Sequence, residues 1–153
     1  MKNLKHKAIL TLGLSCGLRI SEVINLKWRH LDKDRNILNV ICGKGKKDRS
    51  TVLNDNLIIL LTEYWHQYKS KEYVFNGQFS IKYSASSIQR IVKKYISPSA
   101  SFHLLRHSYA TYALDNGTEI KPLSLSLGHN SVKTTEIYHH VSANSLKTIK
   151  QAI

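Results

Sequence analysis

Several residue types that stabilise particular classes of protein are scarce in this chain of 153 residues. Two cysteines, Cys16 and Cys42, are too few for a disulfide framework, and their spacing matches no metal-binding motif. The chain has only two prolines and seven glycines, which excludes collagen-like and low-complexity proteins. No apolar run approaches the ~18 residues that a membrane-spanning helix needs. The composition therefore predicts one ordinary globular domain in a reducing compartment such as the cytoplasm.

Acidic residues are also scarce, and this leaves a large charge imbalance. Ten Asp and Glu stand against 23 Lys and Arg, so the formal net charge at pH 7 is +13. A surplus of this size on a small domain favours a polyanionic partner, most often a nucleic acid. A basic protein without such a partner and a protein that binds membrane surfaces are the alternatives that charge alone leaves open.

The hydrophobic pattern predicts a mainly α-helical fold with one small antiparallel β-sheet, an α+β domain. Two β-branched runs, 37–42 and 49–53, flank the sequence GKGKKD and indicate a hairpin whose turn carries three lysines. We expect Asp55 to cap a helix whose apolar stripe, including Trp65, faces the core. Apolar residues at helical spacing predict a short helix capped by Ser21 and further helices at 4–15, 57–68, 84–96, 104–116, 120–127, 131–137 and 143–152.

A set of polar residues spread along the chain has the composition of a phosphoryl-transfer site. His103 and Arg106 share one face of a predicted helix start, which places a proton-transfer group beside a guanidinium fork. Each member taken singly has an ordinary structural explanation, such as a surface arginine or an interface tyrosine. Together they supply a phenol nucleophile, cations for the phosphate oxygens and an acid for the leaving oxygen. The set consists of Arg19, Lys44, His103, Arg106, His129 and Tyr138.

A metal centre is not expected. His103 and His107 are four residues apart, the spacing of a zinc-binding pair on a helix, but no glutamate of an HExxH motif accompanies them. Neither cysteine is near them in the sequence. The chain also has no acidic cluster of the kind that holds Mg²⁺ beside the residues of the set.

Four motifs, in their order and spacing, resemble the catalytic domain of the tyrosine recombinases, the phage integrase family. They are GLRISEV, GKGKKDR, HLLRHSYAT and LGHNSVKTTEIYHHV, and the resemblance runs over about residues 5–145. It implies the mainly helical fold of the DNA breaking and rejoining enzymes. It also implies a site-specific recombinase, or integrase, that cleaves and rejoins DNA strands through a 3′-phosphotyrosyl intermediate.

The resemblance implies a role for each member of the set. Tyr138 would be the nucleophile, and Arg19 and Arg106 would bind the scissile phosphate. Lys44, on the hairpin, would protonate the leaving 5′ oxygen.

The remaining implied roles concern proton transfer and support. His103 would assist proton transfer at the tyrosine, and His129 would hydrogen-bond the phosphate. Glu22 would support the active site from behind. The basic residues expected to contact DNA are Lys46, Lys47 and Arg49.

The same resemblance implies double-stranded DNA as the partner, with no cofactor, no metal and no membrane partner. We expect a monomer alone and a tetramer on DNA, assembled by exchange of the C-terminal helix, in the bacterial cytoplasm near the nucleoid. Residues 1–153 are expected to form a single catalytic domain, without the N-terminal core-binding domain that family members usually carry.

Two other functions stay open at this stage. One is a DNA-binding module without independent turnover, against which the complete set of six residues argues. The other is DNA relaxation like that of a type IB topoisomerase, against which the similarity of the flanking sequence to bacterial integrases argues.

Overall fold

A computed structural model describes residues 1–42 and 48–129 of the chain. These residues form a mainly helical domain with a small three-stranded sheet, which confirms the predicted fold class. None of the helices in the described segments is both long and apolar enough to cross a membrane. The predicted helices at 131–137 and 143–152 lie outside the described residues. The elements are α1 (Leu4–Cys16), α2 (Ile20–Ile24), the 3-10 helix η1 (Trp28–His30), β1 (Leu31–Asp32), β2 (Ile37–Val40), β3 (Arg49–Val52), α3 (Asp55–Tyr68), α4 (Ala85–Tyr95), α5 (Phe102–Asp115) and α6 (Ile120–Leu127).

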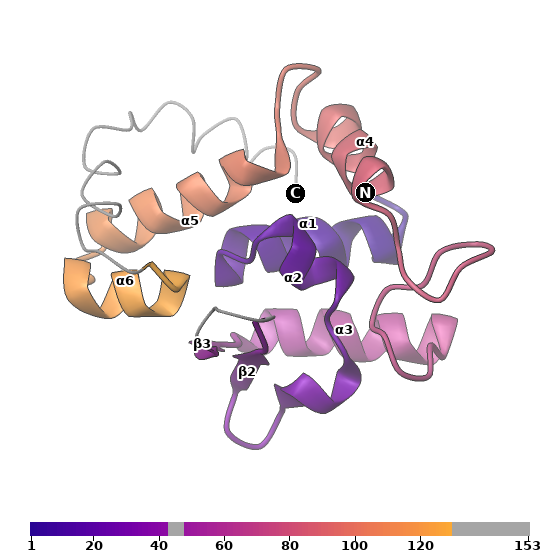
Figure 1. Ribbon diagram of the computed structural model, residues 1–153, viewed down its shortest axis with the longest axis horizontal. Coiled ribbons are helices and arrows are strands. Elements are labelled where there is room, and N and C mark those ends of the chain that lie inside the picture. Colours follow the sequence, from indigo (N-terminus) through magenta and orange to yellow (C-terminus); the bar gives the residue numbers. More distant parts are fainter. Residues whose placement is uncertain (43–47, 130–153) are drawn as a thin grey trace.

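Helix α1 is the central helix of the fold. Helices α3, α4 and α5 pack against it, as Figure 1 shows. Ala8, Ile9, Leu10 and Leu12 of α1 are all fully buried, because neighbours enclose the helix on more than one side. At Gly13 an added Cβ would lie 2.9 Å from Leu105 Cδ1, so this glycine allows α1 and α5 to approach closely.

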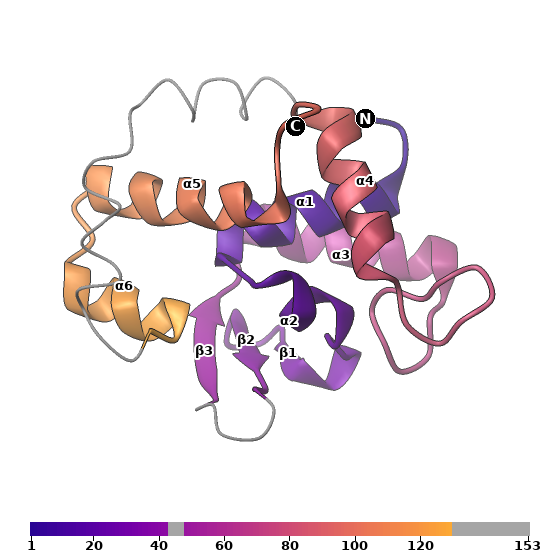
Figure 2. The same cartoon turned by 45° about the horizontal axis from the view of Figure 1, so that its top comes forward.

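The sheet has the order β1–β2–β3 with antiparallel pairing, and it lies beside α2 and α6 (Figure 2). Strands β2 and β3 confirm the predicted hairpin, whereas the two-residue β1 was not predicted because it is too short to show a periodic pattern. Arg49 and Thr51 of β3 point inward, and Val52 is exposed. The inward face of β3 is polar because it covers a cluster of charged side chains.

Two helix caps differ from the predicted ones. Helix α2 begins one residue before Ser21, because the Glu22 carboxylate accepts a hydrogen bond from the backbone N–H of Arg19 at 2.7 Å and so caps the helix. The cap of α3 is Asn54 rather than Asp55, since the Asn54 side chain accepts from the backbone N–H of Leu57 at 2.8 Å.

The prediction that Trp65 of α3 faces the core is wrong. Trp65 is 43% exposed, whereas Leu57, Leu61 and Tyr64 are buried. The buried stripe follows positions three or four residues apart, and Trp65 lies at its edge, where it lines a surface hollow with Trp28.

Candidate active site

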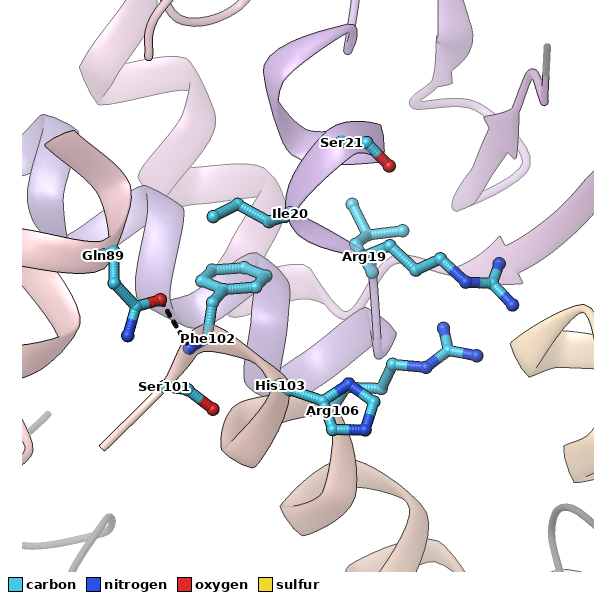
Figure 3. A pocket seen from close by; sticks show the side chains of 9 residues that line it. Arg19, Ile20, Ser21, Gln89, Ser101, Phe102, His103 and Arg106 are labelled. Atoms are coloured by element: carbon cyan, nitrogen blue, oxygen red, sulfur yellow. Dashed lines mark hydrogen bonds between the residues drawn. The ribbon is translucent and has the colours of Figure 1, made fainter. Parts of the chain in front are cut away.

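Four residues of the predicted set come together where the ends of α1 and α6 meet α2 and α5. Arg19 directly precedes α2, His103 and Arg106 lie on α5, and His129 follows α6. Lys44 and Tyr138 lie outside the described residues, as do Lys46 and Lys47. A pocket of about 380 Å³ opens at this place (Figure 3) and is lined by Leu18, Arg19, Ile20, Ser21, Gln89, Ser101, Phe102, His103 and Arg106.

Arg106 is buried, at 2% exposure, and held by the carbonyl ends of two helices. Its guanidinium donates to the carbonyl oxygens of Gly17 at 2.6 Å and Leu127 at 2.7 Å. Gly17 and Leu127 lie at the C-terminal ends of α1 and α6, where the helix dipole is negative and unpaired carbonyls are available. These acceptors allow a cation to remain charged inside the protein.

Arg19 is the more accessible of the two arginines, since its side chain is 31% exposed. It donates to the Glu22 carboxylate at 3.0 Å and to the carbonyl oxygen of Gly128 at 3.3 Å. Figure 3 shows Arg19 and Arg106 extending in the same direction from α2 and α5. Two guanidinium groups placed in this way suit the oxygens of one tetrahedral anion.

Glu22 lies behind Arg19 and is shared between two arginines. Arg49 donates to both of its carboxylate oxygens, at 2.8 and 2.9 Å, in addition to the bond from Arg19. Burial raises the pKa of Glu22, but the hydrogen bonds from Arg49 and Arg19 outweigh it and hold the pKa below its usual range. Glu22 is therefore an ionised carboxylate beside Arg19. The supporting role that the family resemblance implies for it stays a prediction.

The charges of this cluster do not cancel. Arg19 and Arg49 share the single carboxylate of Glu22, and Arg106 adds a third guanidinium that is bonded to backbone carbonyls instead. These four groups therefore carry a surplus of two positive charges. A partly desolvated surplus of this kind favours an anion in the pocket.

His129 is bonded to Arg106, with 3.0 Å between Nη2 and Nε2. Because a guanidinium only donates, Nε2 must accept, and the proton of the neutral ring then resides on Nδ1. Burial, followed by the charges of Arg106 and Arg19, lowers the pKa of His129 to about 4. At pH 7 this histidine is thus a neutral hydrogen-bond donor through Nδ1.

His103 occupies the first turn of α5 and meets His107 edge to face, with ring centroids 4.4 Å apart. Burial lowers the pKa of His103, and the charges of Arg106 and Arg19 lower it further. A neutral imidazole here is suited to accept a proton from a phenol. Across residues 1–42 and 48–129 no three His, Cys, Asp or Glu side chains gather closely enough to hold a metal ion.

Arg49 is placed differently from the expectation. The sequence predicts an exposed contact to DNA, but the side chain is 5% exposed and is bonded to Glu22 and to the carbonyl oxygen of Ser126. The alternation of the hairpin is the signal that could have indicated this, because Arg49 has the same facing as the buried Thr51 two residues later.

Gln89 of α4 was not singled out from the sequence, yet it organises the start of α5. Its side-chain amide donates to the carbonyl oxygen of Ala100 at 2.9 Å and accepts from the backbone N–H of Phe102 at 3.1 Å. It therefore caps the helix that carries His103 and Arg106. No sequence signal marks it, since the contact joins two separate elements.

The comparisons with known proteins concern the family and the fold. The sequence model of the group described as the phage integrase family matches residues 1–145. A putative integrase/recombinase y4qK from Sinorhizobium fredii is 36% identical over 94% of this chain and 49% of its own length. Tyrosine recombinase XerD from Proteus mirabilis is 32% identical over 97% of this chain and 51% of its own length.

A crystal structure of XerA recombinase superposes on this chain with a TM-score of 0.83 at 32% identity. The match covers 97% of this chain and 58% of the XerA chain. The 153 residues thus span about half the length of the curated relatives that they match.

Proposed function

Since the chain belongs to the phage integrase family, we propose that its 153 residues form the catalytic domain of a site-specific DNA recombinase. The enzyme cuts a DNA strand by transesterification and rejoins it to another strand. The observation that carries this proposal is the pocket in which Arg19 and Arg106 lie beside two neutral histidines, with a surplus of positive charge. Its chemistry is that of a site for a phosphodiester.

The reaction needs a nucleophile, and we assign this role to Tyr138. Its phenolic oxygen attacks the scissile phosphorus, the bond to the 5′ oxygen breaks, and a 3′-phosphotyrosyl ester forms. Because a phenol has a pKa near 10, its proton must be removed during the attack, for which His103 is the acceptor. The ester retains the energy of the broken bond until a 5′ hydroxyl of the partner strand attacks it, so the cycle requires no cofactor.

The other residues stabilise the charge that develops. Arg19 and Arg106 bind the non-bridging oxygens, and His129 donates a hydrogen bond to them through Nδ1. Lys44 protonates the departing 5′ oxygen. A neutral His129 suits this role, because it adds a donor without a further charge repelling the arginines.

The substrate is double-stranded DNA, which the net charge of +13 supports. Lys46 and Lys47, in the connection between β2 and β3, contact its backbone. We further propose that the protein is monomeric alone and forms a tetramer on DNA, joined by exchange of its C-terminal helix. Such an assembly acts on chromosomal or mobile-element DNA, near the bacterial nucleoid.

The decisive experiment is covalent trapping on nicked DNA. Duplexes with a randomised core carry a nick close to the cleavable position on its 3′ side. The short fragment that bears the new 5′ hydroxyl then diffuses away after cleavage, and the adduct accumulates. The wild-type protein should give a denaturant-resistant protein–DNA adduct, and Tyr138→Phe should abolish it while retaining DNA binding.

Tyr109→Phe and Tyr112→Phe are matched controls, because each removes one hydroxyl from a tyrosine of α5. Both should retain the adduct. An adduct that survives Tyr138→Phe, or that maps to either control tyrosine, contradicts the assignment. Binding by the wild type without any adduct would indicate a DNA-binding module instead of an enzyme.

A further inference from the structure

Arg49 is the first residue of β3, and it joins three separate parts of the fold. Its two terminal nitrogens donate to the two oxygens of Glu22 in α2, and its Nε donates to the carbonyl oxygen of Ser126 in α6. A fork-to-fork contact between guanidinium and carboxylate fixes both side chains in orientation as well as in position.

The space around Arg49 is closely filled. A Cβ at Gly128 would lie 2.9 Å from Arg49 Cδ, so the residue that ends α6 must be small for the arginine to lie there. Gly128 also has a φ of +66°, a conformation that favours glycine. The position of Arg49 is therefore built into the packing of β3 against α6.

Glu22 transmits this position to the pocket. The same carboxylate accepts from the Arg19 side chain at 3.0 Å and from the Arg19 backbone N–H at 2.7 Å. Arg19 is thus held from behind by a group that is itself held by Arg49.

We propose that Arg49 is a positioning residue for strand cleavage, which acts through Glu22 to orient Arg19 toward the scissile phosphate. This inference rests on the proposed function, and it replaces the DNA contact that the sequence predicts for Arg49. A lysine would keep the charge but lose the two parallel bonds, so arginine is required for the orientation.

The first test separates positioning from DNA contact. Arg49→Gln and Arg49→Lys are compared with Arg35→Gln, an exposed arginine that follows β1. Arg49→Gln should slow adduct formation about 10- to 100-fold, because hydrogen bonds to a charged group are lost. The rate of Arg49→Lys should lie between those of Arg49→Gln and the wild type. Arg35→Gln should form the adduct at nearly the wild-type rate. The salt dependence of DNA binding should not change, whereas loss of a phosphate contact would reduce its slope by about 1 and overturn the proposal.

The second test is a double-mutant cycle with Glu22→Gln. If Arg49 acts through Glu22, the double variant should be no slower than Glu22→Gln alone. Additive losses of rate overturn the proposal. As the pH is lowered, the cleavage rate of Arg49→Gln should begin to fall at a higher pH than the rate of the wild type. The reason is that Glu22 becomes easier to protonate without its partner.

A third measurement does not depend on activity. Carboxyl NMR titration of Glu22 should show a higher pKa in Arg49→Gln than in the wild type, with thermal melts showing that both are folded. If the wild type forms no adduct, the proposed function fails. The titration still tests whether Arg49 stabilises the ionised carboxylate of Glu22. An unchanged Glu22 titration overturns the role of Arg49.

Discussion

At the scale of single residues, the site combines permanent cations with histidines that stay neutral. Arg19 and Arg106 contribute guanidinium groups, which carry a positive charge in proteins. His129 beside them has its pKa lowered to about 4 by burial and by their charges. This difference makes stability depend on pH in a direction that can be tested.

Replacement of His129 by glutamine should reduce the acid sensitivity of the fold. An unfolded histidine has a pKa of 6.5, so between about pH 4 and 6.5 the unfolded state binds more protons than the folded state at this residue. The free energy of unfolding of the wild type should therefore fall as the pH decreases through this window. Urea titrations at several pH values should show a smaller fall for His129→Gln.

The control is His66→Gln, which changes an exposed histidine of α3. It measures the effect of exchanging a histidine for glutamine at an exposed position outside the pocket. Equal curves for His129→Gln and the wild type would show that His129 titrates alike in both states and would remove the reason for calling it neutral.

Lys44 can be tested by changing the leaving group instead of the protein alone. Lys44→Ala should slow cleavage of ordinary DNA, because the 5′ oxygen then departs without a proton donor. A 5′-bridging phosphorothioate needs no acid, so the variant should cleave it at nearly the wild-type rate, as measured by adduct formation. Lys71→Ala, at an exposed lysine after α3, should behave as the wild type on both substrates. Failure of the sulfur substrate to restore the rate would remove Lys44 from the acid role.

At the scale of elements, the ends of helices supply most of the backbone hydrogen-bond partners of this site. The last carbonyls of α6 and the glycine that follows α1 accept bonds from the arginines, and Gln89 of α4 caps α5. The C-terminal ends of α1 and α6 thus place negative partial charges and hydrogen-bond acceptors beside the arginines, and Gln89 occupies a backbone N–H at the start of α5.

Substitution of Gly17 should damage both stability and the site. Its φ is +58°, and a Cβ there would lie 2.5 Å from Tyr109 Cδ1. Gly17→Ala should therefore cost more than the ~1–2 kcal/mol of a left-handed backbone alone, and it should displace the carbonyl that holds Arg106. Urea denaturation measures the first effect and adduct formation the second.

Gly117→Ala is the matched control, because Gly117 has a φ of +85° but no atom within 4 Å of an added Cβ. It should show only the backbone cost and retain adduct formation. Equal losses of stability in the two variants would mean that the contact with Tyr109 is relieved by movement of the ring.

At the scale of the whole molecule, the charge of +13 governs association with DNA. Binding should weaken steeply with salt, and for 6–10 phosphate contacts the loss is ~10³–10⁵ in affinity between 50 and 200 mM. A gel-shift or filter assay over this range measures the slope. Lys46→Gln and Lys47→Gln should each reduce it by about 1. A flat dependence on salt would be inconsistent with a DNA partner.

The sequence by itself determined the elements and the inventory of the site. Helical and strand periodicities are local, so the central helices and the β2–β3 hairpin follow from residues that are neighbours in the chain. Arg19, His103, Arg106 and His129 are identified differently, from the order and spacing of motifs that resemble those of the tyrosine recombinases. Trp65 and the helix caps show where a local pattern is off by one or two positions.

Only the tertiary structure decided which polar groups share a partner. Arg106 and the Gly17 carbonyl are 89 residues apart in the chain, and Arg49 is 27 residues from Glu22. Such contacts depend on how separate segments pack, and no local pattern carries that information. For this reason the sequence predicts Arg49 as a surface cation, whereas in the fold it is buried and bonded to Glu22.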